Sequence, residues 1–106
     1  MPNKYRGEIG AELGGRQRTL VLTLGALAEL ESAFGAGDLM TLAERFGSGR
    51  VSSRDLIRII GAGLRGAGEA VSDDDVAVMT VEGGAAGFVR IAADLIGATF
   101  DESGAP

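Results

Sequence analysis

The chain of 106 residues contains no cysteine and no histidine. Without cysteine, disulfides, thiolate zinc sites and a cysteine nucleophile are excluded. Without histidine, the commonest general base and the commonest metal ligand are missing, and so are the usual catalytic triads. Carboxylates, hydroxyls, Lys4 and Tyr5 are what remains for chemistry. We therefore expect a protein that is not an enzyme and that carries no cofactor and no metal.

Long apolar runs are also lacking. No run approaches the roughly 20 residues of a membrane span. The first residues, MPNKYRGE, do not contain the apolar core of a signal peptide. The sequence therefore predicts a cytoplasmic protein that makes no membrane contact.

Basic residues are too few for a dedicated nucleic-acid binder, because the net charge is −5 and such proteins gain affinity by neutralising phosphates. The charge is also unevenly distributed. Residues 1–65 carry nine basic and seven acidic side chains, whereas residues 66–106 carry one basic and eight acidic ones. This asymmetry can orient a partner or a second copy of the chain, so a homo-oligomer is left open.

Glycine, in contrast, is abundant, since its 18 residues lie well above the average of roughly 7%. Many short elements with glycine stops are expected. A chain of this length, with 45% hydrophobic residues, builds one core, and we expect a single domain over residues 1–100. The last six residues, DESGAP at 101–106, are predicted to form a disordered tail.

An alternating pattern near the N-terminus predicts a β-hairpin. One face of YRGEIGAEL, residues 5–13, carries the apolar side chains Tyr5, Ile9, Ala11 and Leu13. The Gly14-Gly15 pair then supplies the positive φ angles of a tight turn, and pairing across it puts Ile9 opposite Leu20. An isolated two-stranded hairpin is only marginally stable, so it must pack on helices.

From Thr23 onwards the apolar residues recur at helical spacing. In the first helix these residues are Leu24, Leu27, Leu30 and Phe34, and Gly35 is its predicted stop. Further helix starts are predicted at Asp38, at Ser52 with Asp55, at Ser72 with its three following aspartates, and at Gly84. The predicted fold class is α+β, an N-terminal β-hairpin followed by a bundle of about five short helices.

The segment IIGAGLRGAG contains a G-x-G-x-x-G pattern, the fingerprint of a dinucleotide-binding turn. That turn requires a strand before it and a helix after it. Here the pattern lies inside a predicted helix, because Arg54, Arg58 and Arg65 fall on one helical face with the apolar residues opposite. We therefore interpret these glycines as sites of close helix packing. A nucleotide-binding module or small enzyme built around them is the alternative from another functional class.

Two apolar helix faces are candidates for binding a partner. The last helix carries apolar residues over roughly 180°, more than the roughly 100° stripe that one packing contact needs. The candidate partner-binding residues are Ile57, Ile60 and Leu64 on the third helix and Phe88, Ile91 and Leu95 on the last. The spacing does not show which of these faces packs against other parts of the chain and which one binds a partner.

The charged clusters have less specific interpretations. Arg54, Arg58 and Arg65 form an arginine stripe that is a candidate electrostatic contact with an anionic partner. Such a stripe is usually a solvated helix face, and it can equally bind its own chain. Asp73, Asp74 and Asp75 are interpreted as the acidic first turn of a helix, because the alternating oxygen ligands and central glycine of a calcium loop are missing.

The resemblance to a known family covers residues 5–100. It is carried by four segments in this order: RTLVLTLGALAELESAFG, LAERF, SSRDLIRIIGAGLRGAG and VEGGAAGFVRIAADLIGATF. Together they resemble the gene transfer agent family of phage-tail-like proteins, which is grouped with tail assembly chaperones and is sometimes labelled tail tube protein. The resemblance implies a small protein that keeps the tape measure protein soluble and helps to recruit tail tube subunits. It also implies absence from the finished particle.

The resulting expectation is a non-enzymatic tail assembly chaperone of a gene transfer agent or prophage particle. Its expected partners are the tape measure protein and the tail tube protein. The alternative is a structural tail component that is retained in the particle. The sequence leaves open the oligomeric state, the face that binds the partner, and the existence of a longer, frameshifted product.

Overall fold

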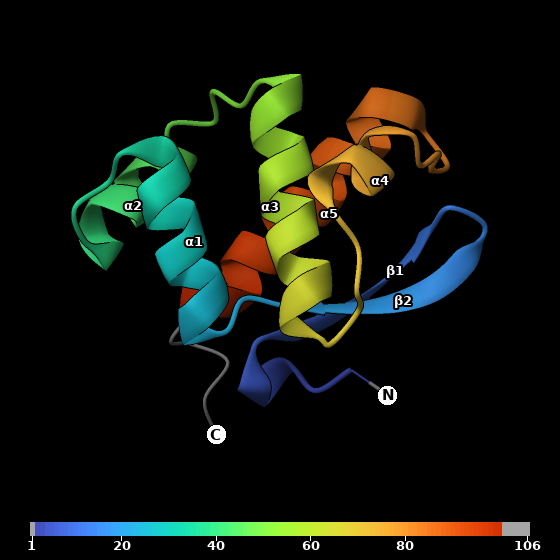
Figure 1. Cartoon of the computed structure of the whole chain (residues 1–106), viewed down its shortest axis with the longest axis horizontal. Coiled ribbons are helices and arrows are strands. Elements are labelled where there is room, and N and C mark those ends of the chain that lie inside the picture. Colours follow the sequence, from blue (N-terminus) through green and yellow to red (C-terminus); the bar gives the residue numbers. More distant parts are fainter. Residues whose placement is uncertain (1, 101–106) are drawn as a thin grey trace.

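The computed structural model describes residues 2–100, and the predicted tail at 101–106 lies outside them. In this part of the chain a short 3₁₀ helix precedes a two-stranded antiparallel hairpin and five α-helices (Figure 1). The elements are η1 Lys4–Arg6, β1 Glu8–Leu13, β2 Arg16–Val21, α1 Leu24–Phe34, α2 Leu39–Gly47, α3 Ser53–Gly66, α4 Asp73–Ala77 and α5 Gly84–Phe100. The predicted α+β class, with the hairpin first and the helices after it, is confirmed.

The hairpin closes where the glycine pair predicts it. Gly14 and Gly15 have φ angles of 61° and 86°, as a two-residue turn of type I′ requires, and Ile9 pairs with Leu20. The first strand is shorter than predicted, because Tyr5 lies in η1 and is 71% exposed. The φ angle of 77° at Gly7 lies outside the β region and interrupts the alternation before Glu8.

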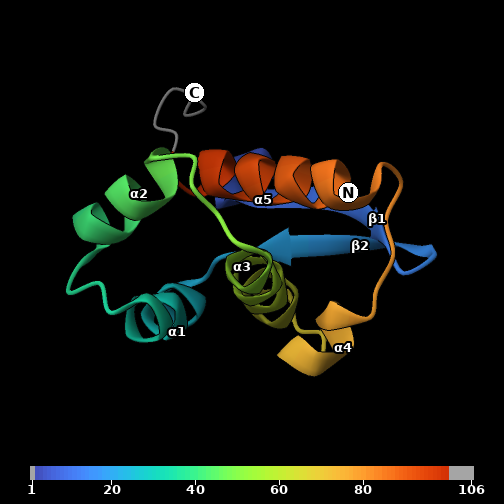
Figure 2. The same ribbon diagram turned by 90° about the horizontal axis from the view of Figure 1, so that it is seen from above.

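The hairpin lies beneath two helices. Helix α3 packs over β2 and α5 over β1, while α1 and α4 lie on either side of α3 (Figures 1 and 2). The largest fully buried side chains come from the hairpin and from four of the helices: Leu13, Leu20, Leu30, Leu42, Ile59, Ile60, Leu64 and Leu95. The described residues therefore share one core, with α3 at its centre.

The helices begin at the predicted caps. The Thr23 hydroxyl accepts a hydrogen bond from the Ala26 N–H at 3.1 Å, and Asp38 caps α2 in the same way. Ser52 and Asp55 form a capping box at the start of α3, in which each side chain accepts from the other residue's backbone N–H. These contacts are local, and local sequence predicted them.

One residue of α1 departs from its predicted side. Leu24, expected on the buried face, is 78% exposed, and the buried stripe starts at Ala26 and continues through Leu27 and Leu30. The stop at Gly35 is as predicted, with a left-handed φ of 68°. Spacing places Leu24 near the buried stripe, but only the packing of α1 against its neighbours decides which edge of that stripe is covered.

Candidate functional site

An apolar groove opens between α3, α4 and the first turns of α5. It encloses about 370 Å³, and most of its lining residues are apolar. They are Ser53, Leu56, Ile57 and Ile60 of α3, Val76 and Ala77 of α4, Met79, Thr80 and Val81 of the connecting segment, and Gly84, Ala85 and Phe88 of α5. We name this surface the α3–α5 groove.

The short helix α4 forms one wall of the groove and is held in place at two points. Val76 is 3% exposed and anchors the helix in the core. At the start of α4, Asp73 lies 3.1 Å from the Arg65 guanidinium of α3. Ser72 caps the helix by accepting from the Asp75 N–H at 3.1 Å, within a second capping box.

The six predicted partner-binding residues separate into two groups. Ile57, Ile60 and Phe88 come together in the α3–α5 groove, where Ile57 and Phe88 are half-buried and Ile60 forms the floor at 1% exposure. The other three, Leu64, Ile91 and Leu95, lie in the core. Most of both predicted faces is therefore used inside the chain, and what remains accessible is the edge beside α4.

Sequence analysis did not identify the third side of the groove. Val76, Met79 and Val81 were not singled out, although Val76 and Met79 are spaced by three residues beyond the acidic turn that starts α4. The available signal is this i, i+3 apolar pair, with Val76 in α4 and Met79 just after its end. Its meaning depends on α4 folding back against α3, which is a contact between distant segments.

The arginine stripe is mostly engaged within the chain. Arg65 donates to the Val71 carbonyl at 3.0 Å and pairs with Glu29 of α1 as well as with Asp73. Arg58 donates to the Ala33 carbonyl at 2.9 Å, at the end of α1. Of the three interpretations left open, contacts within the same chain therefore describe Arg58 and Arg65.

Arg54 lies on the exposed side of α3, in a charged cleft next to the α3–α5 groove. This cleft shares Ser53, Ile57 and Ala77 with the groove and is also lined by Asp74. The apolar groove thus continues into an end that carries charges of both signs.

The glycine pattern lies within α3 and has a packing role at each position. A Cβ atom on Gly61 would lie 2.5 Å from the Asp73 carboxylate oxygen, and one on Gly63 would lie 2.7 Å from the Leu95 side chain. On Gly66 it would collide with the Val21 carbonyl of β2. These glycines let α4, α5 and the hairpin approach one helix closely, as the sequence interpretation holds, and the element before α3 in the described chain is a helix, α2, rather than a strand.

The capping box of α3 is tied to α2 by a charge pair. Arg45 lies 3.1 Å from the Asp55 carboxylate, which is 12% exposed. Burial of this carboxyl opposes its ionisation, but hydrogen bonding to the Ser52 N–H and the charge of Arg45 outweigh that effect. The pKa of Asp55 is therefore lowered from its ordinary value.

Within residues 2–100, no group of three or more acidic residues is arranged to hold a metal ion. None of the helices in the described part of the chain has the length and apolar character needed to cross a membrane.

Comparison with known proteins identifies the family. A family model described as phage tail tube protein, GTA-gp10, matches residues 6–102. No curated protein and no solved structure matches the chain. Because the family model covers almost the whole sequence, the chain belongs to the GTA-gp10 phage tail family.

Proposed function

We propose that this protein is a non-enzymatic tail assembly chaperone of a gene transfer agent or prophage particle, and that its α3–α5 groove shields apolar helical surface of the tape measure protein. The observation that carries the proposal is an accessible apolar groove in a member of a phage tail family. Helix-in-groove binding uses apolar side chains at i, i+3, i+4 and i+7, which a groove between helices accommodates.

The groove suits a contact that is specific but reversible. Ile57 and Phe88 offer half-buried apolar surface, so binding covers surface that the free protein leaves in water. The charged cleft beside Arg54 and Asp74 gives the partner helix one preferred direction. A groove of this size buries only part of a helix, which favours release once tail tube subunits arrive.

The partners follow from the family and the expected role. The tape measure protein occupies the groove, and the complex then recruits tail tube protein. We place the protein in the bacterial cytoplasm, where particles of this type are assembled, and assign no nucleic acid and no membrane among its partners. A single folded unit is sufficient for this role.

The test is co-expression with the tape measure protein encoded near it, followed by size-exclusion chromatography with light scattering. We expect a discrete soluble complex. Ile57→Asp and Phe88→Asp each place a charge in the groove and should weaken the complex at least about tenfold, since burying an unpaired carboxylate is costly. Val89→Asp, on the exposed side of α5, is the matched control and should bind normally.

The retained structural component is the competing outcome. Mass spectrometry of purified particles decides between the two, because a chaperone is absent or rare there and a structural subunit is present in many copies. Many copies per particle, or a Phe88→Asp protein that folds and still binds the tape measure protein with unchanged affinity, would rule out the proposed mechanism.

A further inference from the structure

The outer edge of β1 is open along its middle. In an antiparallel pair, every second residue turns its backbone N–H and C=O away from the neighbouring strand. Across a two-residue turn Leu13 and Arg16 form the hydrogen-bonded pair, so the outward-facing residues of β1 include Gly10 and Glu12. Among the other backbone hydrogen bonds of residues 2–100, none involves Gly10 or Glu12.

Both ends of the same edge already pair with backbone from elsewhere in the chain. The Glu8 N–H donates to the Asn3 carbonyl at 3.0 Å. At the other end, the Gly14 N–H donates to the Thr80 carbonyl at 2.9 Å. The edge therefore pairs with peptide backbone before and after Gly10 and Glu12, and the Pro2 side chain lies next to Gly10.

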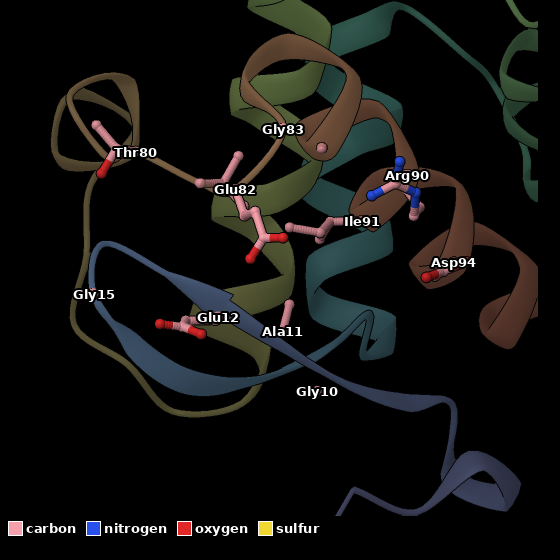
Figure 3. A pocket seen from close by; sticks show the side chains of 12 residues that line it. Gly10, Ala11, Glu12, Gly15, Thr80, Glu82, Gly83, Arg90, Ile91 and Asp94 are labelled. Carbon is pink, nitrogen blue, oxygen red and sulfur yellow. The ribbon is translucent and has the colours of Figure 1, made fainter.

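A groove follows this open stretch, with α5 as its second wall (Figure 3). Its larger part encloses about 610 Å³ and includes Ala11 and Ile91. A second hollow of about 520 Å³ shares Gly10 and Asp94 with it and continues along β1 and α5. The groove thus runs parallel to the strand edge, as a third strand would.

Carboxylates dominate the groove. Glu12 from β1, Glu82 from the segment before α5 and Asp94 from α5 lie around its larger part, and all three are exposed (Figure 3). Arg90 is the one basic residue among those that line it. A segment with basic side chains would be attracted to this surface.

The same charges oppose pairing between two copies of the chain. An antiparallel pair of β1 strands centred on Gly10 would place Glu8 of one copy opposite Glu12 of the other. Like charges directly opposite each other destabilise a strand pair, and natural proteins use them to protect edges. The favoured occupant is therefore a partner of opposite charge.

We propose that the open edge of β1 binds an extended segment of a partner protein as a third strand, with Lys or Arg side chains at alternate positions on the face of Glu12 and with Glu82 and Asp94 adding negative charge along the groove. Backbone hydrogen bonds to Gly10 and Glu12 hold the segment, and the carboxylates select its charge. This surface meets the α3–α5 groove at Thr80 and Val81, and the proposal does not depend on the tape measure protein.

The test is a titration of isotope-labelled protein, followed by nuclear magnetic resonance, with a capped peptide of four Lys-Val repeats. We expect the amide signals of Gly10 and Glu12 to shift and their hydrogen exchange to slow. Glu12→Lys should weaken binding about tenfold, because it reverses a charge in the groove. Glu44→Lys, at an exposed position of α2, makes the same change away from the groove and should leave affinity unchanged.

Two peptide controls separate the sources of affinity. A peptide with Glu in place of Lys should not bind, and one with proline at a central position should lose the protection of Gly10 and Glu12, since proline cannot donate to the ladder. The proposal is wrong if these amides are unaffected at saturation, if both protein variants bind equally, or if light scattering shows that a second copy covers the edge.

Discussion

Gly66 is the glycine at which an added side chain would come closest to another atom, the Val21 carbonyl oxygen. The end of α3 lies against the Val21 carbonyl of β2. This close approach is possible because glycine has no Cβ atom. The neighbouring Gly63 has flexible side-chain atoms opposite it, which can shift, whereas a backbone carbonyl within a hairpin moves only with its strand. The glycine pattern is thus explained by three different neighbours rather than by a bound phosphate.

Gly66→Ala should destabilise the protein by at least about 2 kcal/mol, because added atoms in a packed interior force the backbone apart. Urea denaturation followed by circular dichroism measures the effect. Gly97→Ala is the matched control on α5, where a new Cβ meets no atom within 4 Å. It should be neutral or stabilising by up to about 1 kcal/mol through helix propensity. Equal effects at the two positions would contradict the packing role of Gly66.

The start of α3 is held by contacts both within the helix and with α2. Its capping box satisfies backbone N–H groups within α3, and Arg45 connects it to α2. The pKa of Asp55 is lowered in the folded protein, so its carboxylate contributes stability above the ordinary pKa of about 3.9. That contribution is lost as the pH falls through the lower folded value.

Asp55→Asn should therefore cost roughly 1 kcal/mol at pH 7, and the difference from the natural protein should shrink between about pH 5 and pH 2. Thermal unfolding over this pH range measures it. Glu44→Gln removes an exposed carboxylate from the middle of α2 and serves as the control for the general loss of charge. A difference at Asp55 that stays constant down to pH 2 would show that the charge of this carboxylate does not stabilise α3.

Local sequence predicted most of the elements because their signals act over a few residues. The glycine turn, the caps at Thr23, Asp38 and Ser52 and the stop at Gly35 all depend on neighbours within one turn of chain. Two residues were predicted wrongly. Leu24 is exposed rather than on the buried face, and Tyr5 lies in η1 rather than in a strand. The alternating pattern does not indicate that Gly7 adopts a positive φ, which keeps the strand from extending back to Tyr5.

The candidate site was harder to predict than the fold. The predicted faces contained Ile57, Ile60 and Phe88, but they also contained Leu64 and Leu95, which have no exposed surface. Hydrophobic spacing identifies residues that avoid water. It does not distinguish a partner inside the chain from one outside it.

The molecule as a whole has one core in which the hairpin and the helices share side chains. Leu64 lies fully buried in α3, which packs against β2, α1, α4 and α5. No group of described elements has a separate core in this arrangement. Unfolding is therefore expected to involve all of them together, as the predicted single domain requires.

Leu64→Ala should lower the free energy of unfolding by about 2–5 kcal/mol, since it leaves a cavity at the centre of that core. Amide signals of Ile9 in β1 and Phe46 in α2 should disappear in one transition at the same urea concentration. Val78→Ala, at a residue that is 81% exposed, should change stability by no more than about 0.5 kcal/mol. Loss of the Ile9 signal well before that of Phe46 would mean that the hairpin is a separate unit.

The order of elements, the helix starts and the absence of histidine and cysteine chemistry follow from the amino-acid sequence alone, because composition and short-range hydrogen bonding determine them. Which apolar residues line a groove, which arginines bind their own chain and which strand edge stays open were decided by tertiary structure. Each depends on segments that are distant in sequence, such as α4 beside α3 and α5 beside β1, and burial is a property of such contacts rather than of spacing.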